Sequence, residues 1–367
     1  KRAADGKGHE GESDGGDGAL GPAALRKAAA RAALTERVAV SLQILLTSAV
    51  QLVPFSVIHY TESEPMPGFV LTFVAVVLWL KLVSYVHVNW DFRAARRAGE
   101  IRPGERGHEQ QIPGVQEAVL YPENVTLASL GYFLAAPTLC YQTAYPRSGR
   151  FRTRWLARRL AALFVLLTVM AFFVEQYIGP SIDSSLQPMQ DMDWLRMAER
   201  VLKLSLPTLY LWLAMFVALF DIWLNVVGEI TGFGDREFYK EWWNASTVGD
   251  YWRLWNMPVH KWMLRHVYFP CVRYGLNKFV AGLIVFFVSA VFHEVLVGVP
   301  LHMVRSWSFW GIMAQVPLML VTEWLKKKLD SQRIGNAIFW ISFCFLGQPL
   351  SIILYYHDYR KMHGLLH

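Results

Sequence analysis

The sequence predicts an all-α, polytopic helical membrane protein, and three observations support this fold class. Of its 367 residues, 54% are hydrophobic and 18% are charged, whereas soluble domains average about 25% charged residues. The apolar residues cluster in runs of about 20, the length that a helix needs to cross a bilayer. Lysine and arginine are distributed unequally among the connections between these runs, as in oriented membrane proteins.

The N-terminal region differs from the rest of the chain. Residues 1–24 are polar and rich in glycine and acidic residues, a composition typical of disorder. They lack the apolar core of a cleavable signal, so we expect the first span to serve as its own insertion signal. Residues 25–37 have a basic, weakly amphipathic helical pattern, which suits either the membrane surface or a partner subunit. We therefore expect a disordered to amphipathic cytosolic tail, 1–37, and a membrane domain, 38–367.

Apolar runs predict the membrane-crossing helices of this domain. Segment 127–142 is ambiguous because it is short and is interrupted by Pro137. Arginines flank it on both sides, which favours a re-entrant or buried helix over a crossing one. The expected architecture is a bundle of about seven to nine spans. The seven clear spans are 38–59, 68–90, 160–178, 205–227, 279–301, 307–325 and 337–356.

The basic residues orient this bundle. With a cytosolic N-terminus, 29 of the 36 lysines and arginines fall on the cytosolic side and six on the lumenal side, while Lys81 lies inside the second span. This asymmetry follows the positive-inside rule. It also accounts for the net charge of +7 without a nucleic-acid partner.

The connection 228–278 is predicted to hold interfacial helices that cover the cytosolic mouth of a site. It carries five tryptophans among basic residues, and tryptophan prefers the membrane interface, where its ring is half-buried and its N–H is hydrated. The five are Trp242, Trp243, Trp252, Trp255 and Trp262.

The strongest candidate for chemistry is the pair His293 and Glu294. His293 lies about 20 Å along a span that needs about 30 Å. Ionisable groups at this depth cost several kcal/mol and are expected to face a protein interior or a cavity. On a helix Glu294 points about 100° away from His293, whereas Ser289 shares its face and could orient the imidazole, line a channel or simply pack.

Two amides in later spans could share that site. Gln315 precedes Pro317, and Gln348 precedes Pro349. A buried amide often holds helices together instead of doing chemistry, so either function remains open for each residue alone.

Other features exclude common classes. The three cysteines, Cys140, Cys271 and Cys344, are far apart and suggest neither a disulfide framework nor a zinc site. No nucleotide-binding loop, serine-hydrolase elbow or zinc-protease motif occurs in the sequence. We expect no metal and no cofactor. Two function classes remain, an intramembrane enzyme and a lipid or proton-coupled transporter, for which a membrane His and Glu are equally natural.

Four ordered motifs resemble one family. They are FYKEWWN at 238–244, WNMPVHKW at 255–262, SAVFHE at 289–294 and GQP at 347–349. Together they are similar to the membrane-bound O-acyltransferase family, and specifically to its acyl-CoA:diacylglycerol acyltransferase type 1 branch. Sterol O-acyltransferases share two of these elements, but they tend to have Asp where Lys261 stands. One departure is Glu241, where the family usually has Asp.

The resemblance implies an activity and assigns residues to it. It implies transfer of a fatty acyl group from acyl-CoA to diacylglycerol, giving triacylglycerol, in a chamber that contains His293. His293 would be the general base, and Asn256, Gln315 and Glu294 would complete the catalytic set. A sterol or long-chain alcohol acyltransferase of the same family is the alternative. The implied acyl-CoA contacts are His260, Trp255, Ser289, Gln348, Phe238, Tyr239, Trp242, Trp243 and Asn244.

The resemblance also implies a cellular setting. It implies a multi-pass protein of the endoplasmic reticulum membrane, and the charge asymmetry described above predicts a cytosolic N-terminus. The expected partners are fatty acyl-CoA as a substrate, diacylglycerol, membrane lipids and further copies of the chain in a homodimer or homotetramer.

Overall fold

The computed structural model describes residues 22–99, 121–329 and 332–364. It forms two compact units, Lys1–Ser48 and Ala49–His367. In the first unit the described residues belong to helix α1, Pro22–Thr61, which continues into the second unit. Residues 25–37 are therefore helical, and no break separates them from the first predicted span. The predicted disorder of 1–24 falls almost wholly outside the described residues.

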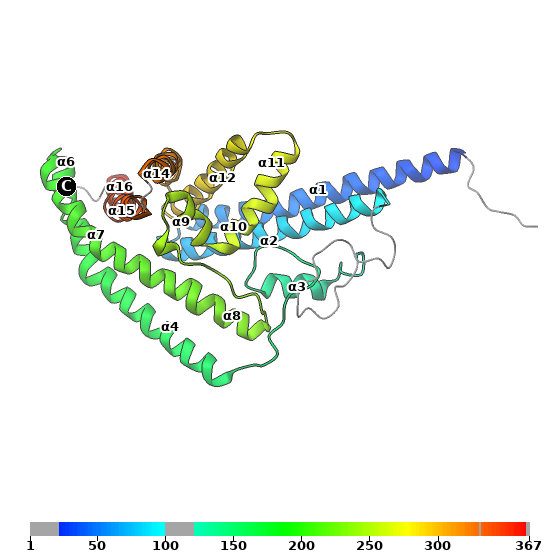
Figure 1. Ribbon diagram of the computed structural model, residues 1–367, viewed down its shortest axis with the longest axis horizontal. Helices are drawn as coiled ribbons and strands as arrows, with labels where there is room; N and C mark the ends of the chain where they lie inside the picture. The colour runs from blue at the N-terminus through cyan, green and yellow to red at the C-terminus, as the bar shows by residue number, and fades with distance from the viewer. Residues whose placement is uncertain (1–21, 100–120, 330–331, 365–367) are drawn as a thin grey trace, which may run out of the picture. The chain divides into compact units, whose positions relative to one another are not determined.

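The second unit is built from helices (Figure 1). In the described part of this unit the one β-type pairing is an isolated bridge between Arg147 and Phe233. The all-α fold class is confirmed. The remaining elements are α2 (Pro65–Arg97), α3 (Leu127–Ala135), α4 (Thr153–Phe173), η1 (Val174–Ile178), α5 (Gly179–Asp183), α6 (Leu186–Gln190), α7 (Trp194–Phe216), η2 (Val217–Trp223), α8 (Leu224–Thr231), η3 (Trp242–Asn244), α9 (Val248–Leu254), α10 (Met257–Met263), η4 (Leu264–Tyr268), α11 (Phe269–Arg273), α12 (Lys278–Gly298), α13 (Trp307–Met313), α14 (Gln315–Leu329), α15 (Gln332–Ile341), η5 (Ser342–Gly347) and α16 (Gln348–Met362).

Several of these elements join end to end into long apolar helices, so the chain is a multi-pass membrane protein. Over the described residues, six helices are long and apolar enough to cross a bilayer. They correspond to six of the seven predicted spans, although the helix of 279–301 ends three residues early, at Gly298. In Figure 1, α4 lies beside the helix that α7 and α8 form with η2. The six are Ala33–Thr61, Pro65–Arg97, Thr153–Met189, Trp194–Thr231, Lys278–Gly298 and Arg333–Met362.

The predicted span 307–325 differs from the expectation of one continuous helix. The chain forms α13 and then α14, with Ala314 as the C-cap between them. Pro317 explains the break, because it has no N–H to donate to the carbonyl of Met313 and its ring would clash with that carbonyl. Neither piece is long enough to be one of the crossing helices.

Segment 127–142 is only partly helical. Its helix, α3, has nine residues, about 13 Å at 1.5 Å per residue, which is less than half of a hydrocarbon core. Thr126 caps its start by accepting a hydrogen bond from the Ser129 N–H. Pro137 disfavours helical conformation at Ala136, which is extended.

Lys81, inside the second predicted span, caps the C-terminal end of α3. Its buried ammonium group donates to the carbonyls of Phe133, Leu134 and Ala136 at 2.9, 3.0 and 2.6 Å. Carbonyls at a helix C-terminus have no partner within the helix. A single cation thus satisfies three of them and joins α2 to α3.

The connection 228–278 consists of short helices, as predicted, but its tryptophans are not all interfacial. Trp242 and Trp262 are each only 2% exposed. Trp242 belongs to an aromatic core that contains Phe216, Phe220 and Tyr251, and the Trp262 N–H donates to the Leu80 carbonyl at 2.8 Å. The expectation of half-hydrated rings is therefore wrong for these two residues, because neighbouring helices cover them.

Candidate active site

His293 is held in one tautomer by its own helix. Its Nδ1 lies 2.7 Å from the carbonyl oxygen of Ser289 and 3.5 Å from the Ser289 hydroxyl. A carbonyl oxygen can only accept, so Nδ1 carries the proton and Nε2 keeps its lone pair. Ser289 therefore orients the imidazole, as the shared helix face suggests, but chiefly through its backbone.

Trp252 lies edge-on to the imidazole, with ring centroids 6.5 Å apart. It belongs to α9 (Val248–Leu254), so this contact brings the connection 228–278 to α12. Its indole N–H is buried and has no hydrogen-bond acceptor among the described residues. The sequence shows Trp252 only as one of five tryptophans, and nothing in that pattern singles it out as the neighbour of His293.

Glu294 faces away from His293 and joins two other helices. One carboxylate oxygen accepts from the N–H groups of Arg305 and Ser306 at 3.1 and 2.8 Å. The other accepts from the Phe309 N–H at 3.3 Å and from the Tyr355 hydroxyl at 2.6 Å. Both oxygens are thus occupied by protein donors from α13, its approach and α16. This geometry does not support the predicted catalytic assignment of Glu294 and fits a positioning role.

The turn that carries α13 back to Glu294 needs a glycine. A Cβ at Gly298 would lie 2.6 Å from the carbonyl oxygen of Met303. The Met303 N–H also donates to the Gly298 carbonyl at 2.9 Å. Gly298 therefore allows the chain after α12 to fold closely against that helix.

Asn256 caps helix α10. Its side-chain oxygen accepts from the Val259 N–H at 3.1 Å, the usual N-cap bond. Its amide nitrogen donates to no acceptor in the part of the chain that the structure describes. The residue has one structural bond and one N–H₂ group still available for a ligand.

Two further residues of the WNMPVHKW motif have different surroundings. Trp255 stacks on Tyr251, with ring centroids 5.8 Å apart and planes 10° apart. His260 is half-buried, and its pKa is lowered by burial and then by the positive charge of Arg253. His260 is therefore neutral at pH 7 and can donate or accept a hydrogen bond.

Gln315 and Gln348 each begin a helix. Gln315 opens α14, directly after the Ala314 break, and Gln348 opens α16, directly after the π-helical turn η5. Both are half-buried, and their amides have no hydrogen bonds within the described ranges. Within the described ranges, neither amide forms a hydrogen bond with His293. Helix α13 packs on α12, which carries His293, and also on α14 and α16, which begin with the two glutamines.

The FYKEWWN segment supports the Asn256 segment through its backbone. The Lys240 N–H donates to the Leu254 carbonyl at 2.8 Å, and the Met257 N–H donates to the Phe238 carbonyl at 3.0 Å. Phe238 and Trp242 are core residues, while Trp243 and Asn244 are exposed. The Tyr239 hydroxyl donates to Asp221 at 3.3 Å. This segment therefore holds the cap residue Asn256 in place.

A glycine permits α15 to pack against the same segment. A Cβ at Gly335 would overlap the carbonyl oxygen of Ser246. Next to it, the Asn336 amide donates to the carbonyls of Trp243 and Ala245 at 2.9 Å each. Neither residue stands out in the sequence, because both serve contacts about 90 residues away along the chain.

Metal binding finds no support in the described residues. Within residues 22–99, 121–329 and 332–364, no three His, Cys, Asp or Glu side chains are grouped so that they could hold an ion. The predicted absence of a metal and of a cofactor stays a prediction.

Comparison with known proteins agrees with the resemblance of the motifs. The sequence model of the membrane-bound O-acyltransferase family matches residues 111–357. The chain is 48% identical over 334 residues to diacylglycerol O-acyltransferase 1 of Corylus americana, covering 90% of the chain and 60% of that protein. It is 46% identical over 332 residues to diacylglycerol O-acyltransferase 1 of Arabidopsis thaliana, with coverage of 90% and 60%. Identity to the Bos taurus protein of that name is 41% over 336 residues, with coverage of 91% and 68%.

The matches cover most of this chain but only part of two of these relatives. The chain spans 60% of the length of the Corylus and Arabidopsis relatives, so the activity of the whole proteins does not pass to it directly. Membership of the family is established, because the sequence model of the family covers well over half of the chain. The predicted family is confirmed: this chain belongs to the membrane-bound O-acyltransferases.

Proposed function

We propose that the protein transfers a fatty acyl group from acyl-CoA to the free hydroxyl of diacylglycerol, forming triacylglycerol and CoA. The observation that carries this proposal is the state of His293, an intramembrane imidazole whose Nδ1–H is bound to the Ser289 carbonyl and whose Nε2 is free to accept a proton. The similarity to proteins named diacylglycerol O-acyltransferase 1 supports the choice of substrates.

The reaction proceeds by direct transfer. Nε2 of His293 accepts the hydroxyl proton of diacylglycerol while its oxygen attacks the thioester carbonyl carbon, so a C–O bond forms and a tetrahedral oxyanion develops. The C–S bond then breaks, and the CoA thiolate takes the proton from the imidazolium. The Ser289 carbonyl stabilises the imidazolium by accepting from Nδ1. A positioned base of this kind contributes about 10²–10⁴-fold to the rate.

The amides stabilise the oxyanion. The amide nitrogen of Asn256 keeps its N–H groups free while its oxygen caps α10, and Gln315 has an amide without a protein partner in the described residues. Such donors are worth more in a water-excluded site than in water. Glu294 acts as a positioning residue, since it holds α13 and α16, which lead to Gln315 and Gln348.

The acyl-CoA is held mainly from the cytosolic connection. His260, Trp255, Ser289, Gln348 and the exposed part of FYKEWWN contact it. Its polyanionic CoA enters from the cytosol. Basic residues of the connection attract it: Arg236, Lys240, Arg253, Lys261 and Arg265.

The protein works without a metal or cofactor in the endoplasmic reticulum membrane. Its N-terminus is cytosolic, because most basic residues fall on that side. It assembles as a homodimer or homotetramer.

An acceptor panel tests the proposed function. The purified protein is given labelled acyl-CoA with diacylglycerol, a sterol or a long-chain alcohol. Labelled triacylglycerol, with less than a tenth as much ester from the other acceptors, is the expected result. Preferential esterification of the sterol or the alcohol would establish the alternative acceptor, and transport of substrate without any ester would establish a transporter.

A further inference from the structure

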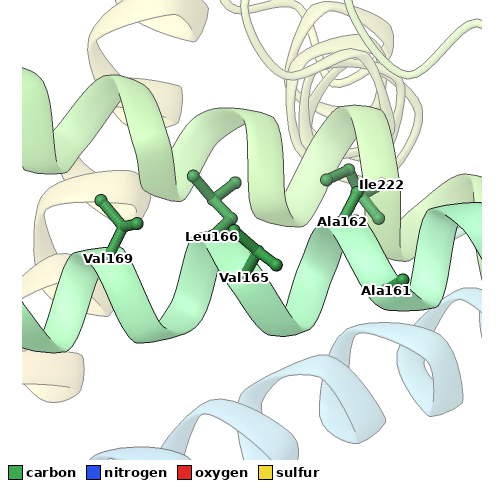
Figure 2. Close-up of a pocket in the computed structure, with 6 residues that line it drawn as sticks. All are labelled: Ala161, Ala162, Val165, Leu166, Val169 and Ile222. Carbon is green, nitrogen blue, oxygen red and sulfur yellow. The ribbon is translucent and has the colours of Figure 1, made fainter.

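An apolar groove runs along α4, a different helix from α12, which carries His293. It has a volume of about 470 Å³, and its wall is formed by α4 with one residue of η2. Figure 2 shows these side chains between the two adjoining helices. The lining residues are Ala161, Ala162, Val165, Leu166, Val169 and Ile222.

The length of the groove along α4 is close to the thickness of the hydrocarbon layer of one membrane leaflet. From Ala161 to Val169 the helix rises about 12 Å, and half of a hydrocarbon core is about 15 Å. The two consecutive alanines leave space that larger residues would fill. Because α4 lies in a predicted crossing helix, lipid chains and not water surround it.

Two arginines lie on the same face of α4 as the residues that line the groove. Arg158 precedes Ala161 and Ala162 by three and four residues, and Arg154 precedes Arg158 by four, so all lie on one face of α4. Both arginines are exposed. In the described chain neither makes an ion pair, a side-chain hydrogen bond or a ring contact.

The neighbouring charges leave these two arginines available. Arg159 pairs with Asp221 at 2.7 Å, and Asp221 also accepts from the Tyr239 hydroxyl. Arg152 pairs with the buried Glu229 at 2.8 Å. The acidic groups of α8 and η2 are thus already matched by other arginines.

We propose that this groove binds an anionic phospholipid, with one acyl chain along Ala161–Val169 and its phosphate at Arg154 and Arg158. The two arginines and then the apolar groove follow each other along one face of α4, as the phosphate and then the acyl chain follow each other in a phospholipid. Arginine forms paired hydrogen bonds to phosphate oxygens, and basic residues at a membrane surface favour anionic lipids. The proposal does not depend on the reaction at His293.

Native mass spectrometry of the full chain in detergent tests this site, with phosphatidylglycerol and phosphatidylcholine as probes. The wild type is expected to retain phosphatidylglycerol more tightly. The double variant Arg154→Gln/Arg158→Gln is expected to bind phosphatidylglycerol roughly tenfold more weakly, with phosphatidylcholine unchanged. Ala162→Phe fills the hollow and should weaken retention of both lipids.

Matched controls separate a built site from diffuse attraction. Arg96→Gln/Arg150→Gln removes the same charge from exposed positions elsewhere, and Leu160→Phe adds the same ring at a lipid-exposed position outside the groove. Both should bind like the wild type. The proposal is overturned if the wild type does not distinguish the lipids, if the arginine control loses binding equally, or if Ala162→Phe retains both lipids. A changed oligomer in Ala162→Phe would also overturn it, since a second copy of the chain would then occupy the groove.

Discussion

The Tyr355 hydroxyl donates a 2.6 Å hydrogen bond to Glu294, the residue next to the proposed base. This bond ties α16 to α12 in a buried place, and Glu294 simultaneously holds the start of α13. One carboxylate therefore fixes the relative positions of α13, which precedes Gln315, and α16, which begins with Gln348.

Tyr355→Phe is expected to destabilise the protein by about 1.5–3 kcal/mol, because it removes a bond to a charged, buried acceptor. Turnover should fall as well, since α16 loses its attachment to α12. The measurement is the melting temperature together with turnover at saturating acyl-CoA. Tyr356→Phe is the control: its hydroxyl makes an equally short bond to Asp183 in an exposed place, so it should change both quantities much less. Equal effects of the two variants would contradict the role of Glu294.

Lys81→Met should be strongly destabilising. It leaves the carbonyls of Phe133 and Leu134 without a donor inside the protein, while the Ala136 carbonyl keeps only the Thr138 N–H. Each unsatisfied buried group costs about 1–3 kcal/mol. A loss of about 3 kcal/mol or more in the free energy of unfolding is expected. Lys203→Met is the control, since Lys203 makes an exposed pair with Glu199 that is worth about 0–1 kcal/mol. A stable Lys81→Met protein would show that water reaches these carbonyls.

The lowered pKa of His266 predicts that the folded protein loses stability in mild acid. Burial, then the charges of His87 and Arg265, lowers its pKa from 6.5 to about 3. Its ring nitrogens lie 2.9 Å from His87 Nδ1 and 2.8 Å from the Ser84 hydroxyl. Between about pH 6.5 and 3 the unfolded chain binds a proton here that the folded chain does not, so stability falls as the pH falls.

The melting temperature between pH 7.5 and 5 measures this effect. Its slope should be shallower in His266→Gln than in the wild type, by up to about 1.4 kcal/mol per pH unit in free energy. His59→Gln, at an exposed position, should keep the wild-type slope. An unchanged slope in His266→Gln would mean that His266 is protonated in the folded protein.

Asn256→Asp separates capping from catalysis. Aspartate keeps the oxygen that accepts from Val259 and caps a helix as well as asparagine does, but it has no N–H to donate. The melting temperature should therefore be unchanged while turnover at saturating acyl-CoA falls by about 10²–10³-fold. Gln315→Ala should behave in the same way. Wild-type turnover with a lower melting temperature would make either residue structural.

Six crossing helices and their order could be predicted from sequence, because apolar runs of about 20 residues depend only on local composition. The break between α13 and α14 could in principle be predicted too, since it follows from one proline, Pro317, within an otherwise suitable run. Burial of Trp242 and Trp262 could not, because composition does not show which helices will cover an aromatic residue. Without knowledge of tertiary contacts, a cluster of tryptophans among basic residues predicts a position at the membrane interface.

The site was predictable where it depends on neighbours in one helix. His293 and Ser289 are four residues apart, so their contact follows from helical geometry. Glu294 is different: its proximity to His293 in sequence suggests chemistry, but its strongest partner, Tyr355, is 61 residues away. Lys81 is visible as a charge inside a span, yet its acceptors lie 52 to 55 residues further on. Long-range partners of this kind are set by packing.

Nε2 of His293 is the proposed base, and the turnover of two variants at this position tests that role most directly. His293→Ala removes the imidazole, and His293→Asn offers an N–H to the Ser289 carbonyl in place of Nδ1–H while removing the base. Both purified variants should keep the wild-type oligomer and melting temperature and form triacylglycerol at below 1% of the wild-type rate, roughly the 10²-fold or greater loss expected for a base, while His59→Ala stays fully active. Retention of more than a few per cent of the activity by either His293 variant would contradict the claim.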